Sequence, residues 1–345
     1  MPSLPLSRLF PCRPTLNLHP PPLRPLALAL VPTLIWLLMF TLCKYIPSTI
    51  RPHIAVSLLP NLDEVFFQNP LGLLFFSGAL VTITYLITSN TLSLLMVFVP
   101  LTLRALHQLA ERQYAVLDVL GFLPYGVLHY TSPVLFGVWI GMMYGSPTAM
   151  TFLKAFGAQN ILGVATQIIL PSAAPWYNDL YGFAPASYAM PGNPAGLARV
   201  DKLFGTHLYT STFSKSPLVF GALPSLHSGF AVLIFLFANH FSRKAGAVTA
   251  VYVLWQWWAT MYFRHHYMVD LCMGAAYSTG CYLFFRRYLP PPPKSEYDAI
   301  GTKSTISDIG REEGREEMYA LKEVVVEGRD RDRGESSGMS MVGAG

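Results

Sequence analysis

The chain has 345 residues, of which 52% are hydrophobic and only 12% are charged. A soluble domain carries about 25% charged residues, so the composition excludes an ordinary soluble protein and indicates a polytopic membrane protein. The net charge of +5 is unevenly spread: residues 1–290 hold 16 Lys and Arg against 7 Asp and Glu, and the rest hold 8 against 12. Lipid headgroups are the expected partners of the basic part. Nucleic acid is not, because no Lys/Arg cluster alternates with aromatic residues.

Four segments follow from composition. Residues 1–25 are rich in Pro and contain three Arg, so we expect a disordered basic arm in the cytosol. Residues 26–70 are expected to form a first, retained membrane helix and a loop. Residues 71–289 are expected to form a catalytic membrane domain. The tail, 290–345, starts with PPPP and is rich in Glu, Arg, Gly and Ser, which predicts a disordered cytosolic segment.

Apolar stretches predict an all-α bundle of about six to eight transmembrane helices. After the first helix, these stretches cover residues 71–103 (broken at 88–91 into two spans), 127–144, 156–170, 224–239, 245–263 and 268–285. Residues 104–124 are more polar and predict an interfacial helix. The basic pairs at 243–244 and 286–287 should face the cytosol. This places loop 171–217 in the lumen and favours eight spans with both termini cytosolic.

Two histidine motifs, PSLH at 224–227 and HHYMVD at 265–270, lie at the ends of the expected antiparallel pair of helices. His266 and Asp270 are four residues apart and share one helix face. The carboxylate can accept the Nδ1–H of the imidazole and leave Nε2 as a nucleophile. A structural His–Asp pair and a His/His/Asp metal site are the alternatives. No third strong ligand stands at metal spacing, so we expect neither a metal nor another cofactor.

The PSLH motif predicts an anion site at a helix start. Pro224 suits the first helical turn, which would leave the amides of Ser225, Leu226 and His227 as free donors. The Ser225 hydroxyl adds a donor, and His227 can act as the acid or base. Together the two motifs predict phosphoryl transfer through a phospho-histidine intermediate.

Four cations on the same side could contact phosphate oxygens, and each fits equally well a side chain that extends toward lipid headgroups. They are Arg199, Lys202, Lys215 and Arg264. The loop 171–217 is rich in Gly, Pro and aromatic residues and is too long for a simple connection, which favours a functional lid. The alternative is an aromatic belt at the membrane interface.

PSLHSG and HHYMVD, with their histidines 39 residues apart, resemble the second and third motifs of the type-2 phosphatidate phosphatase-like superfamily. Five further stretches sharpen the resemblance: DVLGFLPYGVLH (118–129), APWY (174–177), YAMPG (188–192), GLARVD (196–201) and FGTHLYT (204–210). Together they resemble the fungal inositol phosphorylceramide synthases, the family that the antibiotic aureobasidin A inhibits. The resemblance covers roughly residues 70–288.

The resemblance implies a six-helix core that transfers phosphoinositol from phosphatidylinositol to ceramide and releases diacylglycerol. It implies His266 as nucleophile, Asp270 as its partner and His227 as acid/base, in a Golgi membrane with a lumenal site and often a small membrane regulatory subunit. The chain departs from the superfamily at Thr260, where an Arg is expected, and at Leu226, where a Gly is expected; the first motif of the superfamily is not evident. A phosphate site with fewer cations than the superfamily usually has fits a phosphodiester donor, which carries one charge.

Two other functions stay open. A lipid phosphate phosphatase would use water as the acceptor. A non-catalytic lipid transporter or scaffold is disfavoured, because a transporter is expected to hold ionisable residues near the middle of the membrane and no predicted span has one there.

Overall fold

The structure, a computed structural model, describes residues 22–88, 94 and 96–291. All of them fall in the first of two units of the chain, Met1–Pro292, and the second unit, Pro293–Gly345, lies outside. Nearly all of the predicted basic arm and acidic tail is therefore outside the described residues. The first helix begins at Leu23, three residues before the predicted start.

The prediction of an all-α fold is confirmed, since the described residues form helices and no strand. Isolated bridges join Ala55 to Ser172 and Ser172 to Gly221. The α-helices are α1 (Leu23–Leu42), α2 (Leu58–Asp63), α3 (Pro70–Thr88), α4 (Phe98–Ala110), α5 (Ala115–Phe122), α6 (His129–Tyr144), α7 (Ser146–Ile169), α8 (Pro175–Tyr181), α9 (Leu197–Phe204), α10 (Leu208–Ser214), α11 (Leu226–Phe241), α12 (Arg243–Tyr262) and α13 (Met268–Phe285). Two π-helical segments, η3 (Glu64–Gln68) and η5 (Leu123–Leu128), follow α2 and α5, and 3-10 turns η2 (Cys43–Tyr45) and η6 (Arg286–Tyr288) follow α1 and α13.

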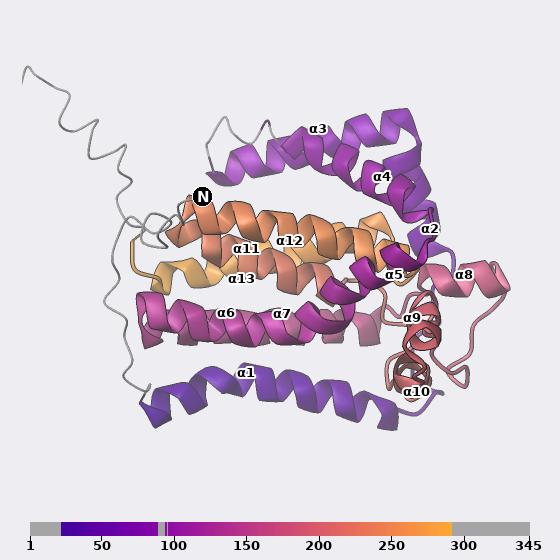
Figure 1. The fold of residues 1–345 in the computed structure, drawn as a ribbon, viewed down its shortest axis with the longest axis horizontal. Coiled ribbons are helices and arrows are strands. Elements are labelled where there is room, and N and C mark those ends of the chain that lie inside the picture. Colours follow the sequence, from indigo (N-terminus) through magenta and orange to yellow (C-terminus); the bar gives the residue numbers. More distant parts are fainter. Residues whose placement is uncertain (1–21, 89–93, 95, 292–345) are drawn as a thin grey trace, which may run out of the picture. The chain divides into compact units, whose positions relative to one another are not determined.

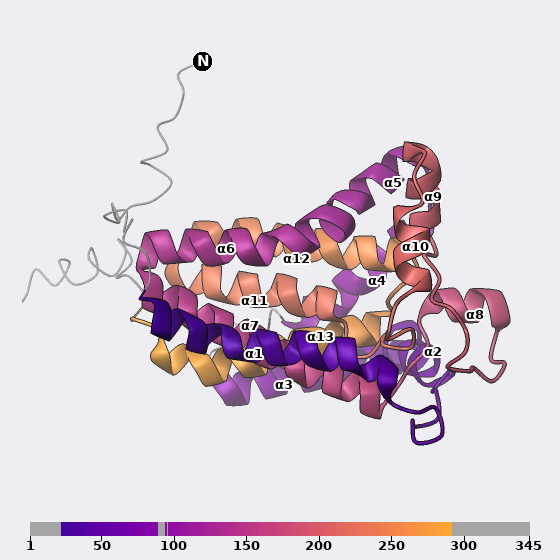
Figure 2. The ribbon, with the colours of Figure 1, turned by 90° about the horizontal axis from the view of Figure 1, so that it is seen from below.

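The long helices run side by side, with α11 against α12 and α13, α7 against α13 and α6, and α1 along α7 (Figure 1). The helix pair α3 and α4 lies on the α12 side of this bundle. The short helices α8, α9 and α10 gather at one end, together with α2 and the start of α5 (Figure 2). That end holds all the candidate site residues.

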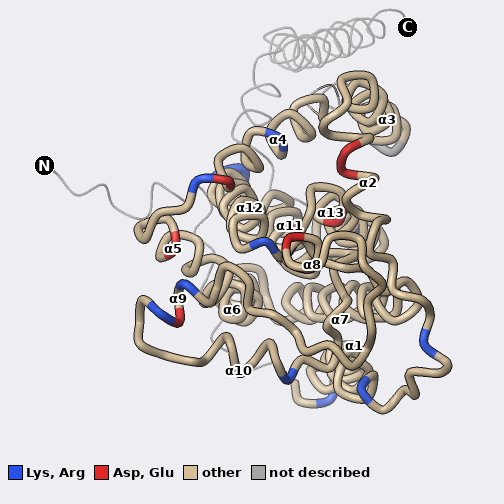
Figure 3. Tube along the Cα trace, turned by 90° about the vertical axis from the view of Figure 1, so that its right-hand side faces the viewer, with Lys and Arg blue, Asp and Glu red and all other residues tan. Residues whose placement is uncertain are grey.

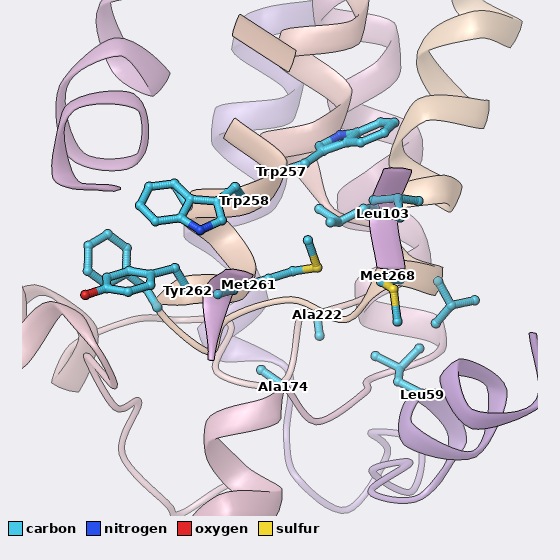
Figure 4. Close-up of a cluster of buried hydrophobic side chains, with 14 of the residues drawn as sticks. Leu59, Leu103, Ala174, Ala222, Trp257, Trp258, Met261, Tyr262 and Met268 are labelled. Atoms are coloured by element: carbon cyan, nitrogen blue, oxygen red, sulfur yellow. The ribbon is translucent and has the colours of Figure 1, made fainter. Parts of the chain in front are cut away.

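Buried apolar side chains pack into two clusters that hold the helices together. Between α6, α7 and α11 the rings of Phe136, Phe152 and Phe237 pack edge to face, with centroids 5.0 and 5.3 Å apart. Near the site, Trp257 and Met261 of α12 lie in a cluster with Met268 of α13 (Figure 4). Leu59 of α2 and Leu103 of α4 belong to the same cluster, so these helices brace the site from one side.

Among the described residues, two segments have the length and apolar composition to cross a membrane alone, Leu23–Tyr45 and Ala115–Tyr144. A third results if Leu58–Gln68 and Pro70–Leu86, bent by 87°, count as one broken span. Helix α7 is as long, with 24 residues, but it carries buried amides such as Gln159 and Asn160, which lower its mean hydropathy. The predicted total of eight spans therefore stays a prediction.

Several predicted boundaries change. The break predicted at 88–91 lies, apart from Thr88, outside the described residues; α3 ends at Thr88 and α4 begins at Phe98. The single interfacial helix predicted over 104–124 is wrong: its first part completes α4, and its second part is α5, which continues into α6. Helix α7 starts ten residues before the predicted span. The hydroxyls of Thr148 and Thr151 donate to carbonyls one turn back, which makes them tolerable in this helix.

Candidate active site

The two histidine motifs meet because α11 and α13 start side by side. The Ser225 N–H donates to the Asp270 carbonyl at 3.0 Å, and the Ser228 hydroxyl donates to the Leu271 carbonyl at 2.7 Å. The Trp257 indole donates to the same hydroxyl at 2.8 Å. Gly274 permits this approach, since a Cβ on it would lie 2.1 Å from the Ser225 carbonyl oxygen. The register between the two helices is thus fixed next to the site.

The three proposed catalytic side chains form a chain of contacts. Nδ1 of His227 faces Nε2 of His266 at 3.2 Å, and Nδ1 of His266 lies 3.2 Å from Oδ1 of Asp270. The second contact has the distance of an ion pair but not the alignment of a hydrogen bond. Neither of its atoms has another hydrogen-bond partner within the described ranges. Asp270 is fully buried, and its Oδ2 accepts the Tyr267 N–H at 3.2 Å. A carboxylate fixed in this way can hold the His266 ring in place.

Both histidines line one cavity of about 180 Å³ at the loop end of the bundle. Other polar groups in its lining are Gln167, Asn193 and His265. Among the described residues that line it there is no Lys, Arg, Asp or Glu. The nitrogen of His227 that faces His266 is Nδ1 and not Nε2. The cavity can admit a small group to both rings, and the ring nitrogens are the basic groups that it presents.

Sequence reasoning assigned no role to the segment that holds the His227 ring. Tyr125 in η5 stacks on one side with ring centroids 4.4 Å apart, and His129 stacks with centroids 4.0 Å apart. His129 in turn stacks on Phe230 at 4.7 Å, and its Nδ1 is buried without a hydrogen-bond partner in the described part of the chain. Tyr125 lies in the π-helical segment η5, a feature common at functional sites, and His129, four residues later, is the first residue of α6. The signal in the sequence was the DVLGFLPYGVLH stretch.

A second positioning residue was also missed. Asp63, at the end of α2, is 3% exposed, and its Oδ1 accepts the N–H of Val269 at 2.8 Å. That N–H belongs to the first turn of α13, one residue before Asp270, and has no partner within a helix. Asp63 therefore fixes the start of the helix that carries the triad carboxylate.

The PSLH motif differs from its prediction. Ser225, not Pro224, precedes the helix: its hydroxyl caps α11 by accepting the Ser228 N–H at 3.3 Å. The Ser225 amide is not a free donor, because the adjacent first turn of α13 supplies its acceptor. Ser225 is fully buried and does not line the cavity, whereas Leu226 and His227 do.

The four predicted cations stand outside the cavity lining. Nε of Arg199 donates to Asp118 at 2.8 Å, and Arg264 makes a two-pronged ion pair with Asp179. Lys202 and Lys215 are exposed. Their contact with substrate stays a prediction. Thr260, at the position where an Arg was expected, is fully buried and donates to the Trp257 carbonyl.

The loop 171–217 folds over the site through three short helices. Gly192, Asn193 and Phe213 contribute to the cavity lining, and the Pro194 carbonyl accepts a hydrogen bond from Nε2 of His265 at 3.1 Å. Burial lowers the pKa of His265 to about 3; the Pro194 contact opposes this shift, and His266 adds to it. His265 is therefore neutral near pH 7 and holds the loop as a hydrogen-bond donor.

Asp201 stabilises the same loop. Burial acts to raise its pKa, but hydrogen bonds from Thr210, Thr206 and the Tyr209 N–H outweigh burial and lower the pKa. The charged carboxylate thereby ties α9 to the start of α10. No group of three or more His, Cys, Asp or Glu side chains that could hold a metal occurs in residues 22–88, 94 and 96–291.

Comparison with known proteins matches this arrangement to a family. A model of the PAP2 superfamily covers residues 92–284, more than half of the chain. The chain is 36% identical to the inositol phosphorylceramide synthase catalytic subunit of Schizosaccharomyces pombe, over 74% of this chain and 53% of that protein. It is 37% identical to the inositol phosphorylceramide synthase of Candida albicans, over 75% and 48%.

A bacterial relative is matched over most of its length. The phosphoinositol dihydroceramide synthase of Bacteroides thetaiotaomicron is 30% identical, over 76% of this chain and 78% of that protein. The chain spans about half the length of the two fungal relatives. No solved structure matches it. The family match and these relatives show that the chain belongs to the PAP2 superfamily.

Proposed function

We propose that the chain is an inositol phosphorylceramide synthase, which transfers phosphoinositol from phosphatidylinositol to the primary hydroxyl of ceramide and releases diacylglycerol. The observation that carries the proposal is the His227–His266–Asp270 chain of contacts at a cavity. The names of the fungal and bacterial relatives supply the product class, inositol phosphorylceramide or its dihydroceramide form; phosphatidylinositol as donor is what the resemblance of the motifs implies.

In the first step, Nε2 of His266 attacks the phosphorus of phosphatidylinositol. The P–N bond forms as the bond from phosphorus to the diacylglycerol oxygen breaks, and protonated His227 gives that oxygen its proton. The 3.2 Å between Nδ1 of His227 and Nε2 of His266 leaves no room for a phosphate between them. In this proposal the contact opens when the donor enters the cavity that both rings line, which frees the Nε2 lone pair for the attack. Asp270 stabilises the positive charge that develops on His266.

In the second step, His227, now neutral, takes the proton of the ceramide hydroxyl. The ceramide oxygen attacks phosphorus, and the P–N bond to His266 breaks. Both histidines return to their starting state. The rings of Tyr125 and His129 both stack on the His227 ring, and this stacking keeps His227 next to His266 in both steps.

The charge of the cavity fits the donor. A phosphodiester carries one negative charge, whereas a phosphomonoester carries about two near pH 7. The described lining residues include histidines and amides but neither Lys nor Arg. Such a lining suits the less charged group, which favours transfer from phosphatidylinositol over hydrolysis of a lipid phosphate.

The same proposal covers location and partners. The chain would lie in the Golgi membrane, as the resemblance implies, with both termini in the cytosol. Its site would face the lumen, because the basic pairs at 243–244 and 286–287 lie at the opposite ends of α12 and α13 from the histidines. A small membrane regulatory subunit and inhibition by aureobasidin A belong to the proposal as family properties.

The test is an assay of the purified chain with headgroup-labelled phosphatidylinositol, with and without ceramide. We expect labelled inositol phosphorylceramide only when ceramide is present, and none from His266→Ala or Asp270→Asn. His207→Ala, which removes an exposed histidine outside the cavity lining, is the matched control and should keep full activity. Release of inositol phosphate into water at equal rates with and without ceramide would instead identify a phosphatase. No turnover in any condition would favour a non-catalytic role.

A further inference from the structure

A second cavity, of about 320 Å³, lies between the turn after α1 and the loop over the site. Its cations are Lys44 and Arg51, and no Asp or Glu occurs among its described lining residues. Figure 3 agrees, since the tube near α1 and α10 carries several Lys and Arg segments and no acidic ones. The volume is at the lower end of the range for small-molecule sites. We call this space the basic cavity.

The basic cavity adjoins the catalytic one. Gln167, Ser216, Leu218 and Val219 line both. Gln167 is 4% exposed, and its Nε2 donates to the Pro224 carbonyl at 3.0 Å, directly before the PSLH serine. A ligand whose phosphate lies at the histidines would therefore have to pass only this one layer of side chains to reach the basic cavity.

Arg51 is held ready for a ligand. Its Nε and Nη2 donate to the carbonyls of Ile46 and Cys43 at 2.9 and 2.7 Å. Its guanidinium lies 4.8 Å from the centre of the Tyr188 ring, and the Tyr188 hydroxyl donates to the Pro52 carbonyl at 2.7 Å. A guanidinium has five N–H groups, so within the described part of the chain three remain for a ligand. Because the side chain is already fixed, a ligand loses little of its binding energy in ordering it.

The polar groups around the cavity suit a polyhydroxylated ring. Lys44 and Arg51 offer charged donors, and Ser216 and Gln167 offer neutral ones beside the Tyr188 ring. The Ser214 hydroxyl donates to the Ser211 carbonyl, so its oxygen can only accept from a ligand. Lys44 and Arg51 precede the part of the chain that the PAP2 superfamily model matches, which begins at residue 92. The histidine chemistry belongs to the matched region, so residues 43–54 can supply a selectivity that the superfamily as a whole does not need.

We propose that the basic cavity is the subsite for the inositol ring of the donor headgroup, with Lys44 and Arg51 as its specificity-determining residues. This inference rests on the proposed function and adds the place where the headgroup is recognised. Residues 186–191, which carry Tyr188, then close one side of the headgroup site rather than forming only an interfacial belt.

The test uses the full chain in mixed micelles, with phosphatidylinositol and ceramide varied separately. Lys44→Gln should raise the apparent KM for phosphatidylinositol at least about threefold, and its combination with Arg51→Gln about tenfold or more, as expected for charge-assisted hydrogen bonds. The KM for ceramide should change less than about twofold. Arg112→Gln, an exposed cation in neither lining, is the matched control. Arg51 also holds its own turn, so Lys44→Gln carries the test if the Arg51 variant unfolds.

A soluble headgroup separates recognition of inositol from recognition of charge. Glycerophosphoinositol should compete with phosphatidylinositol, glycerophosphoglycerol should not, and Lys44→Gln should weaken the competition. Equal inhibition by both compounds, an unchanged KM for phosphatidylinositol, or a rise only in the KM for ceramide would each overturn the proposal. If the unmodified chain transfers nothing, the proposed function fails. In that case the subsite is tested by thermal unfolding. Glycerophosphoinositol should raise the Tm of the unmodified chain and should not raise the Tm of Lys44→Gln.

Discussion

Asp63 offers a test of how the triad carboxylate is positioned. Asp63→Ala removes the acceptor of the Val269 N–H, a 2.8 Å bond in a site where Asp63 is 3% exposed. A buried N–H left without a partner costs about 1–3 kcal/mol, and about 1.4 kcal/mol corresponds to a factor of ten. If that free energy is lost from the positioning of Asp270 in the transition state, kcat should fall roughly 5- to 150-fold.

Asp63→Asn separates the hydrogen bond from the charge, because the Asn side-chain oxygen can accept the same N–H. We expect it to retain most of kcat, with little change in the KM for either lipid. The assay is ceramide-dependent transfer at saturating phosphatidylinositol, with Tm measured on the same samples. Unchanged kcat and Tm in Asp63→Ala would refute the positioning role. An equal loss of kcat in both variants would show that the charge, not the hydrogen bond, matters.

Three further predictions address other parts of the site. Tyr125→Leu should lower kcat about tenfold and Tyr125→Phe much less, because only the former removes the ring stacked on His227; equal activity of the two would exclude a stacking role. Tm should fall as pH drops from about 6.5 toward 4, since unfolded His265 takes up a proton that the folded side chain, with its pKa lowered to about 3, does not. His265 should contribute at most about 1.4 kcal/mol per pH unit to the slope of the free energy of unfolding against pH. The total slope should be smaller in His265→Gln, and an unchanged slope in that variant would contradict the assignment. Adding a chelator should leave transfer intact, and a loss that a divalent metal restores would revive a metal-dependent mechanism.

The sequence predicted the features that depend on local pattern. Helix α13 has the predicted bounds, Met268–Phe285: Asp270 accepts the Tyr267 N–H at its start, and the apolar run ends at the basic pair 286–287. The sequence also predicted that the catalytic candidates lie close together, because two helices joined by a short turn have few possible arrangements. These candidates are His227, His266 and Asp270. Their 3.2 Å contacts follow from that topology.

Features that depend on distant pairing could not be predicted. Nothing near Asp63 indicates that its partner is Val269, 206 residues away. Arg199 and Arg264 look available for phosphate in the sequence, but Asp118 and Asp179 pair with them in the fold. Lys44 lies in a short turn with no motif, and only the packing of that turn against the loop after α7 gives it a cavity to line.

The covalent intermediate is the central claim, and it can be trapped directly. Phosphatidylinositol labelled at phosphorus is mixed with excess protein without ceramide, the reaction is stopped in alkali, and the labelled peptide is identified. We expect label on His266, which passes to inositol phosphorylceramide when ceramide is added and does not form in His266→Ala. Transfer to ceramide at full rate without any labelled histidine, or with the label on another residue, would contradict it.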